Sequence, residues 1–380
     1  MKMTPFLLVL SIAFFARTDG LCAQDAEPDT SAPQQIDPRL NEIQNRFLNQ
    51  QARALLGVAN EAISRFRPQL PEPLERRMAL LLIDGVLHDV YAPQRPPVQE
   101  FFHARLQHAL HQIEDTSVDE GAVIWKLYNH GFIVRTATVT FAFDLVRAYS
   151  VRARSSREPI EGFVLGDDLM EALVRQCDAL FISHRHRDHA DQWVAGAFIE
   201  QGKPVVAPPE VWEGKPIHQQ IVHLEREAHT VQSLPIQNGQ IDLGAVVYPG
   251  HQGAEIQNNV PLVITPEGMS FVHTGDQWSD DLSDFAWIDE VSQNHRVDVL
   301  MPNCWTTDIV RMVQGLDPAL VITGHENEMG HTIDHREPYW LSYQRKAGSE
   351  RFGGNPDVGY DQPLVLMTWG ESYHYNPRDP

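Results

Sequence analysis

The chain has 380 residues, 42% of them hydrophobic, and a formal net charge of −21. This length fits one large domain or two modest ones, and the hydrophobic fraction is enough for a sizeable core. The negative charge argues against DNA or RNA as the main partner, because a protein that binds a polyanion needs a basic surface.

The first 23 residues, 1–23, have the pattern of a secretory signal peptide. Lys2 supplies the positive start, Phe6–Phe15 is a short apolar run, and Ala23 ends a cleavage site. The run is too short to cross a bilayer comfortably, so we expect no transmembrane span, with a short membrane anchor as the alternative. We therefore predict an exported protein, periplasmic or secreted.

A helical segment follows the signal. Residues 24–36 are rich in Asp, Glu, Pro, Ser and Gln, a composition typical of a disordered lead-in. Across residues 37–118 apolar residues recur at helical spacing, and clusters of proline interrupt the pattern twice. This pattern predicts a helical extension of three helices, near residues 37–66, 74–86 and 98–113.

The pattern changes at Gly121, and residues 119–376 are expected to form the main domain. Val123–Leu145 is rich in β-branched and aromatic residues and predicts two or three strands. Asp167 begins a short helix that runs through Cys177. The remaining expected elements are short strands at Pro204–Ala207 and Gln220–Leu224, a helix at Asp191–Gln201, hairpins at Ser233–Gly250 and Val260–His273, buried strands at Val297–Pro302 and Ala319–Thr323, and a closing strand at Pro363–Trp369.

The most informative segment is the hexapeptide His184–His189, which has the pattern H-x-H-x-D-H. It follows an apolar run, Asp178–Ser183, that predicts a buried strand, so the histidines are expected on the loop where the strand ends. Imidazole nitrogens and carboxylate oxygens are the ligands that suit zinc and its first-row neighbours. A metal-binding loop is therefore favoured over a solvated polar loop, the alternative interpretation.

Further ligands are expected just past other apolar strands. Three positions qualify, namely His251, Asp276 and His325, and each follows a glycine that lets the backbone turn close to a metal. His273 competes with His251, but we favour His251 because its Pro-Gly-His-Gln-Gly setting predicts a loop. His331 competes with His325; it is expected at most as a substrate or outer contact.

These residues, in this order, resemble the metallo-β-lactamase superfamily. The H-x-H-x-D-H loop is followed by His251, by Asp276 after Thr-Gly, and by His325. The similarity is greatest to the branch that contains L-ascorbate 6-phosphate lactonase and N-acyl-phosphatidylethanolamine phospholipase D. It implies an α/β fold, specifically an αββα sandwich with an N-terminal helical extension.

The resemblance covers about residues 121–375, and the helical residues 37–118 lie outside it. It implies two divalent metal ions, expected to be zinc, with manganese or iron as alternatives. The implied ligands are His184, His186 and His251 for one metal, Asp188, His189 and His325 for the second, and Asp276 as a bridge between them.

Other roles follow from the same resemblance. Asp144 is similar to a buried aspartate that supports the metal loop. His130, in an early turn, is a candidate hydrogen-bond donor to an oxyanion. Asp188 or Asp276 is expected to accept or shuttle a proton.

The function implied is a binuclear metal-dependent hydrolase. Two adjacent cations lower the pKa of the water between them, so metal-bound hydroxide would attack an ester, lactone or phosphodiester. We expect a small-molecule or lipid-like substrate and no nucleic acid, and the helical extension is expected to cap the pocket or to mediate homo-oligomer formation. The alternatives are a non-catalytic metal-binding protein on the same fold and a di-iron redox protein.

Overall fold

A computed structural model gives the structure of the chain and describes residues 38–147, 151–152, 159–160, 163–253, 255–278, 282–306, 309–348, 350–351, 355–356 and 359–377. The predicted signal peptide and the lead-in at residues 24–36 lie outside these residues. The chain divides into two compact units, Met1–Gln44 and Asn45–Pro380. In the first unit the described residues are the beginning of helix α1, and the sheets and the other helices belong to the second unit.

Three helices occupy the positions where helical spacing predicts them: α1 (Pro38–Arg65), α2 (Leu74–Leu87) and α3 (Pro96–Asp115). Within the second unit, buried residues of α1 recur every three or four positions, at Leu56, Ala59 and Ile63. Two prolines stand in the first turn of α3, where their missing N–H groups cost no helical hydrogen bond. None of the helices in the described residues is long and apolar enough to span a membrane.

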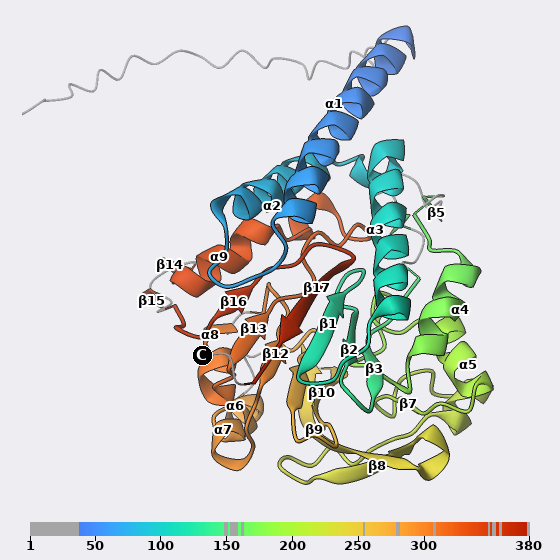
Figure 1. The fold of residues 1–380 in the computed structure, drawn as a ribbon, viewed down its shortest axis with the longest axis vertical. Coiled ribbons are helices and arrows are strands. Elements are labelled where there is room, and N and C mark those ends of the chain that lie inside the picture. Colours follow the sequence, from blue (N-terminus) through green and yellow to red (C-terminus); the bar gives the residue numbers. More distant parts are fainter. Residues whose placement is uncertain are drawn as a thin grey trace, which may run out of the picture. The chain divides into compact units, whose positions relative to one another are not determined.

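The main body contains two large sheets (Figure 1). The first has six strands in the order β17-β1-β2-β3-β6-β7. Their bounds are β17 (Glu371–Tyr375), β1 (Ala122–Lys126), β2 (Phe132–Arg135), β3 (Thr140–Phe143), β6 (Ala179–Phe181) and β7 (Val205–Val206). The pairs β3–β6 and β6–β7 are parallel and the others are antiparallel.

The second sheet has seven strands in the order β16-β13-β12-β11-β10-β9-β8. Their bounds are β16 (Leu364–Val365), β13 (Leu320–Ile322), β12 (Val299–Met301), β11 (Ser270–His273), β10 (Ile256–Ile264), β9 (Ile241–Gln252) and β8 (Gln232–Ile236). The strands from β16 to β11 run parallel, and the two predicted hairpins form β8–β9 and β10–β11.

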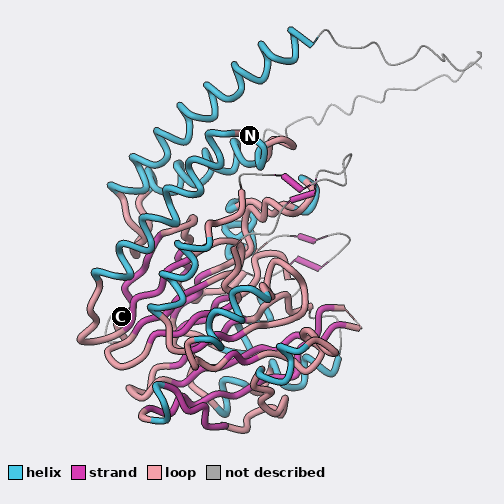
Figure 2. The backbone as a smooth tube through the Cα atoms, turned by 90° about the vertical axis from the view of Figure 1, so that its right-hand side faces the viewer, coloured by secondary structure: helices cyan, strands magenta, loops and turns pink. Residues whose placement is uncertain are grey.

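Alternating side chains hold the two sheets together. On β1, Ile124 belongs to a buried cluster shared with Phe271 and Val299 of the second sheet, whereas Val123 and Trp125 point into a cluster shared with the helices. The period of two in a strand places successive side chains on opposite faces, which explains this division. In Figure 2 the strands, in magenta, lie together in the main body, and helices, in cyan, lie around them. The predicted αββα sandwich is confirmed.

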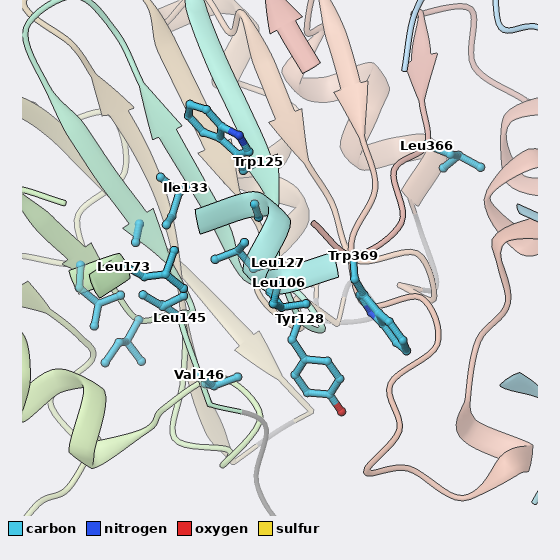
Figure 3. Close-up of a cluster of buried hydrophobic side chains, with 14 of the residues drawn as sticks. Leu106, Trp125, Leu127, Tyr128, Ile133, Leu145, Val146, Leu173, Leu366 and Trp369 are labelled. Atoms are coloured by element: carbon cyan, nitrogen blue, oxygen red, sulfur yellow. The ribbon is translucent and has the colours of Figure 1, made fainter. Parts of the chain in front are cut away.

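Helices cover both outer faces. On the first sheet lie α3, α4 (Asp167–Gln176) and α5 (Gln192–Glu200), and Figure 3 shows the apolar cluster in which Leu106 of α3, Trp125, Tyr128 and Trp369 lie. The second sheet is covered by α6 (Leu282–Ile288), α7 (Val291–Asn294) and α8 (Ile309–Leu316), while α9 (Tyr339–Ala347) lies beside α2. Short two-stranded pairs join β4 (Val151–Arg152) to β5 (Pro159–Ile160) and β14 (Glu350–Arg351) to β15 (Asn355–Pro356).

Two sequence predictions need correction. The strand expected at Gln220–Leu224 is reduced to a single bridge between Val222 and Val206, next to a 3-10 turn at Pro216–Gln220. The closing strand is only β16, and the chain then returns to the first sheet as β17, which the sequence did not predict. The outward face of β17 is polar and partly exposed, so its pattern lacks the continuous apolar run of a central strand. Cys177 and Cys304 are free and buried.

A buried carboxylate joins α2 to the segment before α9. Asp84 accepts hydrogen bonds from the side-chain amide of Asn327 at 2.9 Å and from the backbone N–H groups of Tyr339 at 2.8 Å and Trp340 at 3.1 Å. Burial raises the pKa of Asp84 from 3.8 to about 6, against the lowering effect of these hydrogen bonds. The folded protein therefore holds a proton on Asp84 more tightly than the unfolded chain does.

This shift predicts a pH-dependent stability contribution. A raised folded-state pKa contributes stability that is fully present below the unfolded pKa and is lost as the pH rises through about 6. We expect the free energy of unfolding of the wild type, minus that of Asp84→Asn, to grow as the pH falls from neutral to the ordinary pKa of the carboxyl. Urea unfolding of both proteins across this range measures the difference. A difference that does not change with pH would contradict the assignment.

Candidate metal centre

The metal loop predicted from the sequence, His184–His189, begins three residues after the end of β6. His184 and His189 are fully buried, and Asp188 is nearly so. The loop is closed by two backbone hydrogen bonds to the carbonyl of His186, from the N–H groups of His189 at 3.1 Å and Ala190 at 2.7 Å. The tight turn brings side chains from both halves of the loop to one side.

Two more candidate ligands follow parallel strands of the second sheet. Asp276 comes after β11 and His325 after β13, and both are buried. Gly275 has a positive φ of 52°, and a Cβ atom there would lie 2.3 Å from Cβ of Ser183. Only glycine lets the loop after β11 approach the metal loop this closely. The carboxyl ends of strands from both sheets therefore meet at one place.

The structure brings six of the seven predicted ligands into two groups. In each group the candidate ligand atoms all lie within 4.8 Å of one another. The first group consists of Asp188, His189, Asp276 and His325, and the second of His184, His186 and Asp276.

Asp276 belongs to both groups, and its two oxygens face different ways. Oδ1 lies 3.2 Å from Nε2 of His189 and 3.6 Å from Nε2 of His325. Oδ2 lies 3.6 Å from Nε2 of His184. This division of one carboxylate between two sets of ligands is the geometry of a bridging ligand.

Several ring nitrogens in these groups are buried without a hydrogen-bond partner among the described residues: Nε2 of His184, Nε2 of His189, and both nitrogens of His325. Leaving a buried polar atom unpaired costs roughly 1–3 kcal/mol, so this number at one place requires a compensating interaction. Zinc ligands about 2.0–2.2 Å from a tetrahedral ion lie roughly 3.4 Å apart, which matches the separations around Asp276. The residues present therefore fit divalent metal ions.

The electrostatics also favour a cation. Burial acts to raise the pKa of Asp188 and of Asp276, but the charges and hydrogen bonds of His189 and His325 together outweigh it, and the pKa of each carboxyl stays below its usual range. Burial lowers the pKa of His184 to about 3, with a further contribution from His189, so the His184 imidazole is neutral. Two ionised carboxylates and a neutral His184 suit a metal site. Against the lowering effect of burial, the carboxylates raise the pKa of His189 and of His325, so a bound cation would displace a proton from these rings.

Asp144 supports His189 from behind. Its carboxylate accepts hydrogen bonds from Nδ1 of His189 at 2.7 Å, from the backbone N–H of Ser183 at 2.7 Å and from the Ser183 hydroxyl at 2.6 Å. A carboxylate bound to one ring nitrogen fixes the tautomer and aims the other nitrogen at the metal. The structure therefore places Asp144 where a supporting residue is expected.

His130 and His273 form a buried pair beside Asp144. His273 donates from Nε2 to the carbonyl of His130 at 2.8 Å, since its Nδ1 accepts from the N–H of Gly275 at 3.2 Å. Nε2 of His130 lies 3.2 Å from the carbonyl of Met301, and the two rings are 4.0 Å apart. His130 is fully buried. The role of oxyanion donor, suggested for His130 by the sequence, stays a prediction.

His251 differs most from the expectation. It lies within β9 and not in a loop, so the reason for preferring it to His273 was wrong. Its ring nitrogens fall in neither ligand group. However, Nδ1 lies 3.0 Å from Oδ1 of the buried Asp284, the kind of pair that orients metal-binding histidines. The neighbouring Gln252 instead reaches Asp276, donating from Nε2 to Oδ2 at 2.9 Å.

Two amides around Asp276 were not recognised from the sequence. Asn303 donates from Nδ2 to Oδ1 of Asp276 at 2.5 Å, and Asn258 accepts from the Asp276 backbone N–H at 3.1 Å. Both are buried. Asn303 directly follows a buried strand and a proline, which is the only signal that sequence reasoning could have used.

The open side of the centre is lined by rings. His331 is about one-third exposed, and its Nε2 lies 3.9 Å from Oδ2 of Asp188. Trp305 lies 5.9 Å from the ring of His325 and 5.7 Å from that of Trp278. The rim therefore combines an imidazole with an apolar aromatic wall.

No protein-family model matches the chain, and no curated protein matches it. Solved structures to which it is similar include Igni18, a metallo hydrolase from Ignicoccus hospitalis, at 14% identity over 67% of this chain and 98% of that one, with a TM-score of 0.46. A second, from Thermotoga maritima and placed in the metallo-beta-lactamase superfamily, has 14% identity over 65% and 98% of the two chains and a TM-score of 0.35.

A third is CmlA, a diiron beta-hydroxylase from Streptomyces venezuelae, at 16% identity over 56% of this chain and 47% of that one, with a TM-score of 0.36. These similarities concern the fold, and no residue role is taken from them. The predicted lactonase-like branch stays a prediction.

We predict that Asp144→Asn weakens metal binding. Nδ1 of His189 and the Ser183 hydroxyl both bond Oδ2 of Asp144, and the backbone N–H of Ser183 bonds Oδ1, so an amide must turn its NH2 group toward a donor on one side or the other. The affinity for zinc should fall about 10- to 100-fold, as for other outer ligand partners. Zinc titration against a competing chelator measures this change.

The matched control is Asp298→Asn. Asp298 is also buried and bonded, accepting from the N–H of Ser270 at 2.9 Å and the hydroxyl of Tyr375 at 2.8 Å, but it precedes β12, at the opposite end from the ligands. Its substitution should leave zinc affinity unchanged. An equal loss in both variants would mean that Asp144 acts through general stability and not through His189.

Proposed function

We propose that this chain is a hydrolase that uses two divalent metal ions, one held by each ligand group. The observation that carries the proposal is the position of Asp276, whose two carboxylate oxygens face the two groups separately. When bound, a pair of such ions supplies an activated water near neutral pH and polarises the oxygen of a substrate carbonyl or phosphoryl group.

The residues of the protein would hold the two ions and orient one another. His184 and His186 serve one ion, and Asp188, His189 and His325 serve the other, with Asp276 between them. We infer that His251 completes the first set, with Asp284 orienting its ring. The ligands thus come from the segments after β6, β11 and β13 and, for His251, from the end of β9.

A route for a proton leads from the centre to the rim. Oδ2 of Asp188 lies 3.5 Å from Nε2 of His325 and 3.9 Å from Nε2 of the partly exposed His331. We infer that a proton leaves Asp188 toward His331 across this 3.9 Å separation, which a water molecule can bridge.

The substrate class proposed is an ester, lactone or phosphodiester that is small or lipid-like. The aromatic wall of Trp278 and Trp305 supports an apolar portion of such a substrate next to the metals. Zinc is the proposed metal, with manganese or iron as alternatives that the same ligands accept. Export of the protein remains a proposal that rests on residues 1–23.

The test is Asp276→Ala in the metal-loaded protein. Removing the shared carboxylate should lower the rate of ester or phosphodiester hydrolysis by more than about a hundredfold, the upper range for outer-ligand changes. Initial rates are measured on panels of aryl esters, lactones and aryl phosphodiesters. Unfolding curves show whether the variant keeps its fold.

Asp242→Ala serves as the control, because Asp242 is an exposed residue of β9 that bonds only Ser233 among the described side chains. It should hydrolyse the same substrates at the wild-type rate. Full activity of a folded Asp276→Ala protein on a substrate of the wild type would reject the two-metal mechanism. A wild type that binds metal but hydrolyses no member of the panels would favour a non-catalytic or redox use of the centre.

A further inference from the structure

A second pocket lies outside the metal centre, where α1, α3 and β17 meet. It has a volume of about 100 Å³. Since a single buried water needs roughly 10–15 Å³, the pocket has room for a ligand of several heavy atoms. The polar side chains lining it come from Ser64, Arg67, Arg105, His108, Gln112 and Ser372.

Arg105 is the central group of this pocket. Its side chain is buried, at 7% exposure, and its Nε donates to the carbonyl of Trp369 at 2.9 Å. Among the described residues its two terminal amino groups have neither an ion pair nor a hydrogen bond. A guanidinium keeps its charge at any accessible pH, and burying such a charge without a partner is costly. The pocket therefore holds a cation that needs an anion.

Glu371 lines the same pocket but does not supply that anion. Its carboxylate is bound by both amino groups of the fully buried Arg76, at 2.8 and 2.6 Å, and by the backbone N–H of Thr368 at 2.8 Å. One carboxylate thus faces two buried guanidinium groups, and Arg67 adds a third positive charge at the edge of the pocket. Burial lowers the pKa of Arg105, and Arg76 reinforces the effect while Glu371 opposes it.

The other lining groups suit an oxygen-rich ligand. Burial, followed by the charges of Arg105 and Arg67, lowers the pKa of His108, so its imidazole is neutral and offers one N–H. The Ser372 hydroxyl donates to Oε1 of Gln112 at 3.5 Å, and the Ser64 hydroxyl and the Gln112 NH2 group add further donors. Guanidinium groups bind phosphate through paired N–H···O bonds, and several oxygens on one centre can reach Arg67 and Arg105 together.

We propose that this pocket binds a phosphate group, carried either by free inorganic phosphate or by a phosphomonoester headgroup. The chain has a formal net charge of −21, so local positive charge of this kind stands out against the rest of the protein. The bound anion would compensate the positive charge of Arg105 and connect the helices α1 and α3 to the edge strand β17. The inference is independent of the hydrolase activity, since none of the metal ligands lines this pocket.

The experiment is calorimetric titration of the metal-loaded full chain with inorganic phosphate. We compare the wild type with Arg105→Gln and Arg67→Gln, and use Arg53→Gln as the matched control. Arg53 is an exposed arginine of the same helix α1, paired with Glu100 and absent from the pocket lining. The metal centre can also attract phosphate, so Asp276→Ala is included to distinguish binding at the metal centre from binding in this pocket.

The expected result is a loss of affinity of about tenfold or more in Arg105→Gln and Arg67→Gln, the size expected when a charged hydrogen bond is removed. Arg53→Gln and Asp276→Ala should keep this binding. Phosphate should also raise the thermal unfolding midpoint of the wild type and not of Arg67→Gln. If Arg105→Gln does not fold, the exposed Arg67 still decides the outcome.

Phosphate binding that survives both pocket variants, or that disappears only in Asp276→Ala, would overturn the proposal. Co-sedimentation with phosphatidylcholine vesicles, with and without phosphatidic acid, distinguishes the sources. Arg67-dependent binding to the phosphatidic acid vesicles alone would identify a lipid phosphomonoester as the ligand. Binding of neither free phosphate nor these vesicles would also reject the site.

Discussion

The structure depends on the placement of one carboxylate, that of Asp276, between two groups of ligands. Its Oδ1 lies 3.2 Å from Nε2 of His189 and its Oδ2 3.6 Å from Nε2 of His184. This arrangement requires the loop after β11 to approach the metal loop closely, which Gly275 permits. The two sheets must also face each other so that their strand ends meet, which the shared apolar layer ensures.

Around this carboxylate the polar groups are buried but connected. Asp144 fixes His189, Asn303 and Gln252 bind the two oxygens of Asp276, and Asn258 holds its backbone. In an interior of low dielectric, such networks are rigid when every member is satisfied. Nε2 of His184, His189 and His325 is buried and unpaired among the described residues, and cations bound there would complete the network.

The sequence predicted the parts that depend on local pattern: the three N-terminal helices, both hairpins and the αββα architecture. It also predicted six ligands that the structure groups, because the dense loop at His184–His189 and the glycines before Asp276 and His325 are local signals. It did not predict β17, whose polar face hides its pairing with β1. The setting of His251, the partner Asp284 and the amide of Asn303 depend on contacts between distant segments, which periodicity does not encode.

The measurement that most directly tests the central claim is the metal content per chain, by elemental analysis of protein purified from its native compartment and titrated to saturation. A carboxylate shared between two ligand groups predicts about two divalent ions per chain. Saturation at one ion would mean that Asp276 does not join two sites. No metal bound, and none taken up on titration, would mean that the groups do not form a metal centre.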